Sequence, residues 1–166
     1  MGIEQSMDLK VVPYFVAHDA AEIDLVRRAR PAPAVRRGGA AESIPGAVPD
    51  ASGMIYDLDA VAGRENLAQA LILRLLTPRG SLAALGHAAY GSRLGDLVGR
   101  LKTEAVRNLC RAFVLEAVAQ EPRVDDTAVE LTFDPLQETP SSFVFTLAVR
   151  PRDGDEPIGL SMEVEL

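Results

Sequence analysis

The amino-acid sequence predicts an α+β fold in which two main helices pack on one face of a small antiparallel sheet. Apolar residues recur at helical spacing in two stretches in the middle of the chain, and they alternate with polar residues in three later stretches. Helical patterns followed by strand patterns favour helices gathered on one face of a sheet. The 166 residues predict one main domain over residues 54–166, preceded by an extended N-terminal arm.

Residues 1–53 are predicted to form an N-terminal extension that is weakly structured, followed by a linker rich in Pro, Gly and Ala. Residues 11–16 are apolar enough for a strand, but Pro13 lacks the amide that a central strand needs, which favours an edge strand or an extended arm. Residues 29–53 cannot bury enough apolar surface to offset their ordering entropy. Five arginines of this region either stay solvated or dock on an acidic neighbour. They are Arg27, Arg28, Arg30, Arg36 and Arg37.

The first main helix is expected over residues 64–76, where Leu67, Leu71, Arg74 and Leu75 follow helical spacing. Pro78 should end it, because proline restricts the preceding residue and cannot continue the hydrogen-bond ladder.

A loop is expected over residues 77–91, and Ser92 could cap a short helix through about residue 98. The second main helix should start at an N-cap Thr103, with Glu104 favourable in the first turn. It should end before Pro122.

Three strands are expected at the C-terminal end, over residues 129–133, 143–149 and 158–166. Their period-two alternation, with turn residues between them, predicts an antiparallel meander. Residues 121–166 hold three Lys and Arg against eleven Asp and Glu, so most of the net charge of −7 lies here.

The composition argues against several classes of protein. The acidic net charge disfavours general nucleic-acid binding. No stretch reaches the ~18–20 uncharged apolar residues that a membrane helix needs, so no membrane partner is expected, and the N-terminus lacks the pattern of a signal peptide. Cys110 alone rules out a disulfide within the chain and is interpreted as an inert buried thiol.

The sequence offers little for catalysis. Its two histidines, His18 and His87, lie in no metal-binding spacing, and phosphate-binding and nucleophile-elbow motifs are absent, so neither a metal nor a cofactor is expected. Glu104, Glu116 and Glu121 are the enzymatic candidates, because glycoside hydrolysis needs two carboxyl groups about 5–9.5 Å apart. A solvated helix face is the more common role for the first two.

Glu121-Pro122-Arg123 follows the second helix and is the most unusual triplet of the chain. Two interpretations are open. The triplet either ends the helix with a local ion pair, or it projects from a rigid corner as a charged knob for a partner, with arginine offering bidentate hydrogen bonds.

Three pieces of sequence together resemble a known family: LLTPRG at residues 75–80, YGSRL at residues 90–94, and the EPR triplet. Residues 54–166 resemble the contractile-tail baseplate wedge, or sheath-initiator, family (the GPW family of contractile phages). The family includes the TssE component of type VI secretion and its equivalents in extracellular contractile injection systems.

The resemblance implies a structural baseplate component, assembled in the cytoplasm into a contractile particle. The family has been described as lysozyme-like, but no constellation of residues in this sequence requires hydrolysis, so no enzyme is expected. The implied partners are wedge proteins and the sheath protein, with the central hub or spike and the inner tube nearby, in six copies per baseplate. The resemblance assigns Glu121, Pro122 and Arg123 to wedge binding and the strand over residues 158–164 to sheath binding. The residues of that strand are Ile158, Leu160, Ser161, Met162, Glu163 and Val164.

The residues themselves support strand addition, because a C-terminal strand leaves an edge that can recruit a further strand. Glu163 and Glu165 would then favour a basic partner. Two alternatives are a lysozyme-like muralytic enzyme of the tail baseplate and an adaptor that binds a regulatory protein through the same edge. The sequence leaves open whether the particle is a phage, a secretion apparatus or a released injection device.

Overall fold

The computed structural model describes residues 7–16, 20–25, 27–31, 54–58, 60–152, 154 and 156–166. It divides the chain into two compact units, Met1–Gly63 and Arg64–Leu166. The sequence placed this division ten residues earlier, at residues 53 and 54. The difference arises because residues 54–58 and 60–62 form strands that pair with earlier strands of the N-terminal unit.

The described residues of the N-terminal unit form three antiparallel strand pairs. The pairs are β1 (Met7–Leu9) with β6 (Ala60–Ala62), β2 (Val11–Val16) with β3 (Ala20–Leu25), and β4 (Arg27–Pro31) with β5 (Met54–Leu58). Residues 7–9, 11–16 and 20–25 form strands, where the sequence suggested weak structure with one short strand over residues 11–16. Pro13 lies in a two-stranded pair, in which every strand is an edge. Residues 32–53, with most of the predicted linker, lie outside the described residues.

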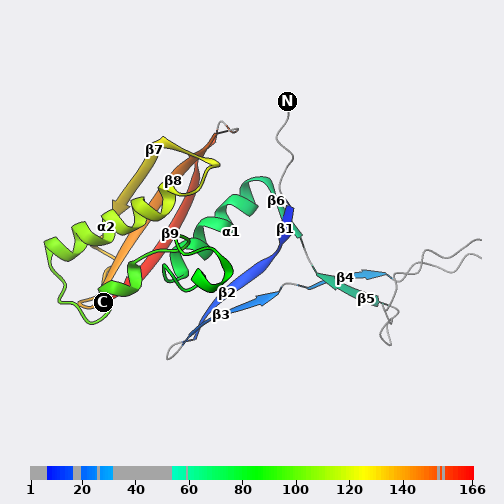
Figure 1. Cartoon of the computed structure of the whole chain (residues 1–166), viewed down its shortest axis with the longest axis horizontal. Coiled ribbons are helices and arrows are strands. Elements are labelled where there is room, and N and C mark those ends of the chain that lie inside the picture. Colours follow the sequence, from blue (N-terminus) through cyan, green and yellow to red (C-terminus); the bar gives the residue numbers. More distant parts are fainter. Residues whose placement is uncertain are drawn as a thin grey trace, which may run out of the picture. The chain divides into compact units, whose positions relative to one another are not determined.

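The second unit holds the predicted α+β domain (Figure 1). Two main helices and an antiparallel sheet of order β7-β8-β9 confirm the fold class and the meander. The main elements are α1 (Gly63–Leu76), α2 (Glu104–Ala119), β7 (Val124–Phe133), β8 (Ser142–Pro151) and β9 (Ile158–Glu165). Two 3-10 turns, η1 (Ala83–Leu85) and η2 (Leu94–Leu97), lie between the helices. No helix in the described part of the chain is long and apolar enough to span a membrane.

One apolar core joins both helices to one face of the sheet. From β8 it takes the odd-numbered residues Phe143, Phe145, Leu147 and Val149, all of which are fully buried. They meet Leu71 of α1 and further apolar side chains of both helices. The helices thus hold one face of the sheet, and the other face presents the even-numbered residues of β8.

The predicted helix caps are confirmed for Thr103 and only partly for Ser92. The Thr103 side chain accepts a hydrogen bond from the Val106 amide at 3.2 Å, which is the predicted N-cap of α2. The segment after Ser92 is only the 3-10 turn η2, whose N-cap position is Arg93, without a side-chain cap. Ser92 is buried; its hydroxyl donates to the Leu75 carbonyl at 2.6 Å and accepts from the amide of Leu94, the first residue of η2, at 3.3 Å.

Candidate functional site

Two of the three sequence pieces join each other directly. Thr77 and Pro78 of LLTPRG run alongside Ser92 of YGSRL. The Ser92 amide donates to the Thr77 carbonyl at 2.8 Å, and the Arg79 amide donates to the Ser92 carbonyl at 2.8 Å. The loop over residues 77–91 is therefore closed at its base by main-chain hydrogen bonds.

Gly91 is required at this closure. Its φ angle is +105°, and a Cβ atom there would lie 2.4 Å from the Thr77 carbonyl oxygen. Any side chain would be strained by the backbone angle and would also collide with the neighbouring segment. The glycine of YGSRL is thus explained by the contact with LLTPRG.

The third piece, the EPR triplet, joins the same region through a buried carboxylate. Glu121 is 6% exposed. Its Oε1 accepts from Arg123 Nε at 2.7 Å, and its Oε2 lies 3.5 Å from Nη2 of Arg74 on α1. Arg123 Nη1 also donates to Asn66 Oδ1 at 3.1 Å. One carboxylate thus connects the turn after α2 to helix α1.

Opposing effects set the protonation of this carboxylate. Burial raises the pKa of Glu121, whereas the hydrogen bonds and charge of Arg123, together with the charge of Arg74, lower it. The arginines prevail, and the pKa lies below its ordinary value. Glu121 is therefore ionised at neutral pH and acts as an acceptor for two arginines.

Arg74 also contacts the second sequence piece. Its guanidinium lies 4.5 Å from the centre of the Tyr90 ring, a cation–π contact. Both residues line a shallow surface hollow of about 520 Å³, together with Arg79, His87 and Gln120. The three sequence pieces thus meet around Arg74, which the sequence placed only as one position of the apolar spacing of α1.

This geometry corrects one interpretation of the triplet. Glu121 does not project as a knob, because it is buried against Arg74 and Arg123. Pro122 is exposed, and the Arg123 side chain is 34% exposed, so a partner could reach only these two. The local ion pair between Glu121 and Arg123 is present as the other interpretation expected.

Two of the three candidate carboxylates, Glu104 and Glu121, lie at opposite ends of α2. Glu104 begins α2 and Glu121 follows its end, so a 16-residue helix of about 24 Å separates them. Glu116 forms an ion pair with Arg79, and Glu104 lies 3.5 Å from Arg107. Each carboxylate is therefore next to an arginine.

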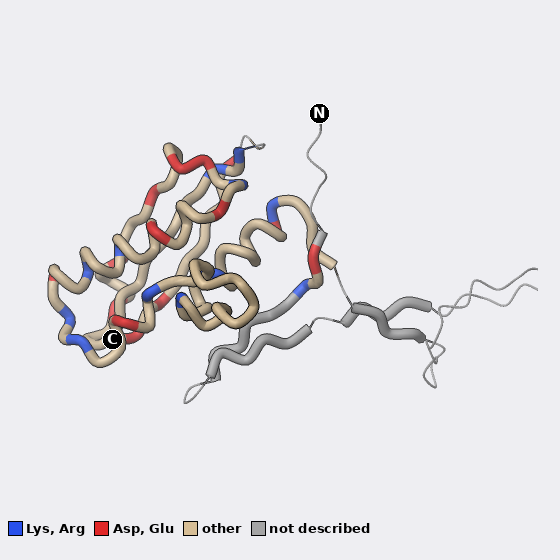
Figure 2. The backbone as a smooth tube through the Cα atoms, in the orientation of Figure 1, with Lys and Arg blue, Asp and Glu red and all other residues tan. Residues whose placement is uncertain are grey.

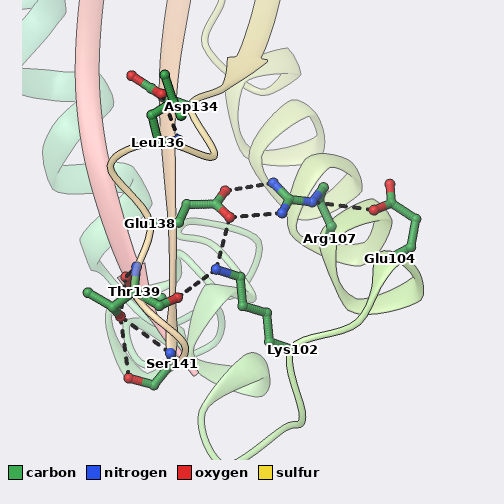
Figure 3. A network of polar contacts seen from close by, with 9 residues as sticks. Lys102, Glu104, Arg107, Asp134, Leu136, Glu138, Thr139 and Ser141 are labelled. Carbon is green, nitrogen blue, oxygen red and sulfur yellow. Dashed lines mark hydrogen bonds and ion pairs between the residues drawn. The ribbon is translucent and has the colours of Figure 1, made fainter.

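A second polar network fixes the turn between β7 and β8 (Figure 3). Glu138 accepts two hydrogen bonds from Arg107 of α2, at 2.6 and 2.8 Å, and pairs with Lys102 at 2.9 Å. Lys102 also donates to the Thr139 carbonyl at 2.6 Å. Arg107 lies over the Phe143 ring at 4.7 Å. The sequence did not indicate this network, because Lys102 and Arg107 are 31 or more residues away from their partners Glu138 and Thr139.

The predicted sheath-binding strand, β9, lies at an edge of the sheet. The Leu166 amide donates to the Ser141 carbonyl, which fixes the register; odd-numbered residues of β8 therefore bond to even-numbered residues of β9. The main-chain groups of Gly159, Ser161, Glu163 and Glu165 consequently point away from β8. Among the described residues no strand pairs with this side of β9.

The acidic C-terminal region, residues 121–166, is only partly neutralised by basic partners. Figure 2 shows its acidic positions at both ends of the sheet. Glu121 and Glu138 are held by arginines, and Asp126 lies 3.9 Å from Arg152. Within the described part of the chain Glu163 and Glu165 form no ion pair, so the edge of β9 keeps its negative charge.

The remaining candidate residues, Cys110 and His87, form no reactive or metal-binding site in the part of the chain that the structure describes. Cys110 is fully buried, and burial raises the pKa of its thiol to about 11, in agreement with the predicted inert thiol. Over the residues that the structure describes, no three His, Cys, Asp or Glu side chains are grouped as a metal would require. His87 is exposed on the surface hollow, and His18 lies outside the described residues.

Comparison with known proteins identifies a solved structure with a similar fold. No protein-family model matches the chain, and no curated protein sequence matches it. A solved structure from Geobacter sulfurreducens, described as a "putative tail lysozyme", has a TM-score of 0.52 and 21% sequence identity. The match covers 61% of this chain and 89% of that one. At this identity the likeness establishes a shared α+β fold.

The Glu138 network predicts a specific acid sensitivity. The hydrogen bonds from Arg107 lower the pKa of Glu138 from 4.5 to about 2. Its contribution to stability is therefore complete above about pH 4.5 and is lost as the pH falls towards 2. Urea unfolding of wild type and Glu138→Gln should give a difference in unfolding free energy that shrinks across this interval.

The matched control for this experiment is Glu104→Gln, because Glu104 lies near the same arginine but is 77% exposed. It should follow the wild-type pH profile. A difference between wild type and Glu138→Gln that stays constant from neutral pH to pH 2 would contradict the assignment.

Proposed function

We propose that this protein is a structural baseplate component of a contractile tail or injection system, and that it starts sheath polymerisation by strand addition. The observation that carries the proposal is the open edge of β9. A shared fold with a protein described as belonging to a tail supports the setting. The three sequence pieces that resemble the sheath-initiator family lie together in space, as expected if they define one structural unit.

The edge of β9 is suited to this role. The main-chain groups of Gly159, Ser161, Glu163 and Glu165 point outwards, and an added strand would pair with them by main-chain hydrogen bonds. A strand bound in this way has a fixed register, so it would place the first sheath subunit relative to the baseplate. The negative charge at Glu163 and Glu165 would steer a basic segment to the edge, and more weakly as salt rises.

Wedge binding is proposed at the other end of the domain. Pro122 and the exposed part of Arg123 form its contact surface, and Glu121 acts indirectly by holding Arg123 in place at 2.7 Å. The guanidinium then has a fixed direction before a partner arrives, which reduces the entropy lost on binding.

The hub, the inner tube and a six-fold copy number follow from the family resemblance and belong to the same proposal.

A muralytic enzyme is the second candidate, and the description of the structural neighbour as a lysozyme favours it. A general acid in glycoside hydrolysis needs a raised pKa, whereas that of Glu121 is lowered. We expect purified wild-type protein to release no soluble fragments from peptidoglycan. Cleavage by wild type that is lost in Glu121→Gln, with the variant still folded, would establish the enzyme instead.

The strand-addition proposal predicts different outcomes for two neighbouring proline substitutions. The Ser161 amide points outwards, so Ser161→Pro removes one donor from the edge and should change the unfolding free energy by no more than about 0.5 kcal/mol. The Met162 amide points towards β8, so Met162→Pro should destabilise the domain clearly. Particles assembled with Ser161→Pro should carry tubes without full-length sheath when viewed by electron microscopy. Normal sheaths on these particles would remove β9 from the mechanism.

A further inference from the structure

The two ends of the β9 edge differ in shape and charge. Across the sheet Gly159 is paired with Ala148, and a Cβ atom at Gly159 would meet nothing within 4 Å. The N-terminal end of the edge therefore has little side-chain bulk on its outer face. At the C-terminal end Glu163 and Glu165 are exposed on that same face.

The two faces of the edge differ as well. The even-numbered residues of β9 point into the core with the helices. Ile158 and Leu160 are each 7% exposed, whereas Met162 and Val164 are only half-buried. Apolar surface thus remains at the edge beside these two residues, where a further strand could cover it.

These features define the sequence of a strand that fits. Directly opposed residues of antiparallel strands place their side chains on the same face. A residue opposite Glu163 or Glu165 therefore lies on the outer face beside a carboxylate, and a residue opposite Met162 or Val164 lies on the core face. A large side chain opposite Gly159 would fill the open position there, as aromatic residues do across from glycine in sheets.

We infer that the β9 edge selects an antiparallel strand with the order basic, apolar, basic, apolar, any, apolar, large. The two basic residues oppose Glu165 and Glu163, and the large residue opposes Gly159. This inference rests on the proposed function, because it assumes that β9 receives a strand; it adds the chemistry and direction of that strand. All strand pairs of the sheet are already antiparallel, which favours the same direction for a fourth strand.

A second copy of the same edge does not fit this description. The outward positions of β9 are Gly159, Ser161, Glu163 and Glu165, and none of them is basic. Two copies paired through β9 would leave four glutamates at their joint edge without a basic partner. The charge therefore opposes self-association and favours a different, basic strand.

The test uses the isotope-labelled full chain and an unlabelled peptide with this order of residues. Amide hydrogen exchange is followed by NMR with and without the peptide. Binding should slow exchange at Ser161, Glu163 and Glu165, whose amides point outwards. The amides of Leu160 and Met162 should change little, because they already bond to β8.

Two control peptides keep the same composition. One exchanges each basic residue with the apolar residue that follows it, so that its basic side chains fall on the core face while its large residue still opposes Gly159; the other has the reverse order of residues. Both should bind at least about tenfold more weakly, because charge pairs and apolar contacts are lost together. Equal protection by the exchanged peptide would overturn the pattern, and tighter binding of the reversed peptide would overturn the direction.

Charge reversal provides a second test. The double variant Glu163→Lys, Glu165→Lys should bind the basic peptide about tenfold more weakly and should prefer a peptide with glutamates at those positions. The control Glu130→Lys changes an exposed charge on β7, at the other edge of the sheet, and should leave binding unchanged. Unchanged binding by the double variant would overturn the inference.

Failure of the inference is distinguishable from failure of the proposed function. If all peptides protect the outward amides equally, β9 accepts strands without selecting them, and only the inference fails. If no peptide protects them and Ser161→Pro particles assemble normal sheath, strand addition itself is wrong.

Discussion

The contact between the Glu121 carboxylate and the arginines at positions 74 and 123 organises the second unit of this protein. A buried carboxylate is unfavourable unless it is paired and hydrogen-bonded. Its partners come from α1 and from the residue before the sheet, so two ion pairs of one carboxylate connect the helices to the sheet. Arg74 in turn lies over Tyr90, whose neighbour Gly91 closes the loop at Thr77. The three sequence pieces that resemble a baseplate family are therefore connected by one set of contacts inside the domain.

The contacts of Glu121 stabilise the domain, whereas the edge of β9 is the proposed binding surface. Main-chain hydrogen bonds from β8 satisfy every second residue of β9 and leave the others directed outwards. The edge needs a stable register to act as a template, and packing of the odd-numbered β8 side chains against both helices supplies it. The internal ion pairs thus support a surface that takes no part in them.

The sequence predicted those features whose signals are local. Helical spacing located α1 and α2, alternation located the three strands, and Thr103 marked the start of α2. The start of β7 was missed, because Asp125 and Asp126 interrupt the alternation and an irregularity separates Val124 from Val129 in the pairing with β8. Burial of Glu121 could not be read from the chain, since its partner Arg74 is 47 residues away. One signal existed: a charged residue within the apolar spacing of a helix needs a partner in the interior.

A double-mutant cycle on Arg74→Met and Glu121→Gln tests the central claim, that a buried ion pair between α1 and the EPR triplet holds the domain together. Glu121→Gln alone should lower the unfolding free energy by about 3 kcal/mol, because it leaves Arg74 without its charge partner in the interior. The double variant should lose less than the sum of the single variants, with a coupling of about 2 kcal/mol. The same cycle on the more exposed pair Arg79 and Glu116 should give a coupling below about 1 kcal/mol. Additive losses at Arg74 and Glu121, or a coupling no larger than that of the exposed pair, would contradict the claim.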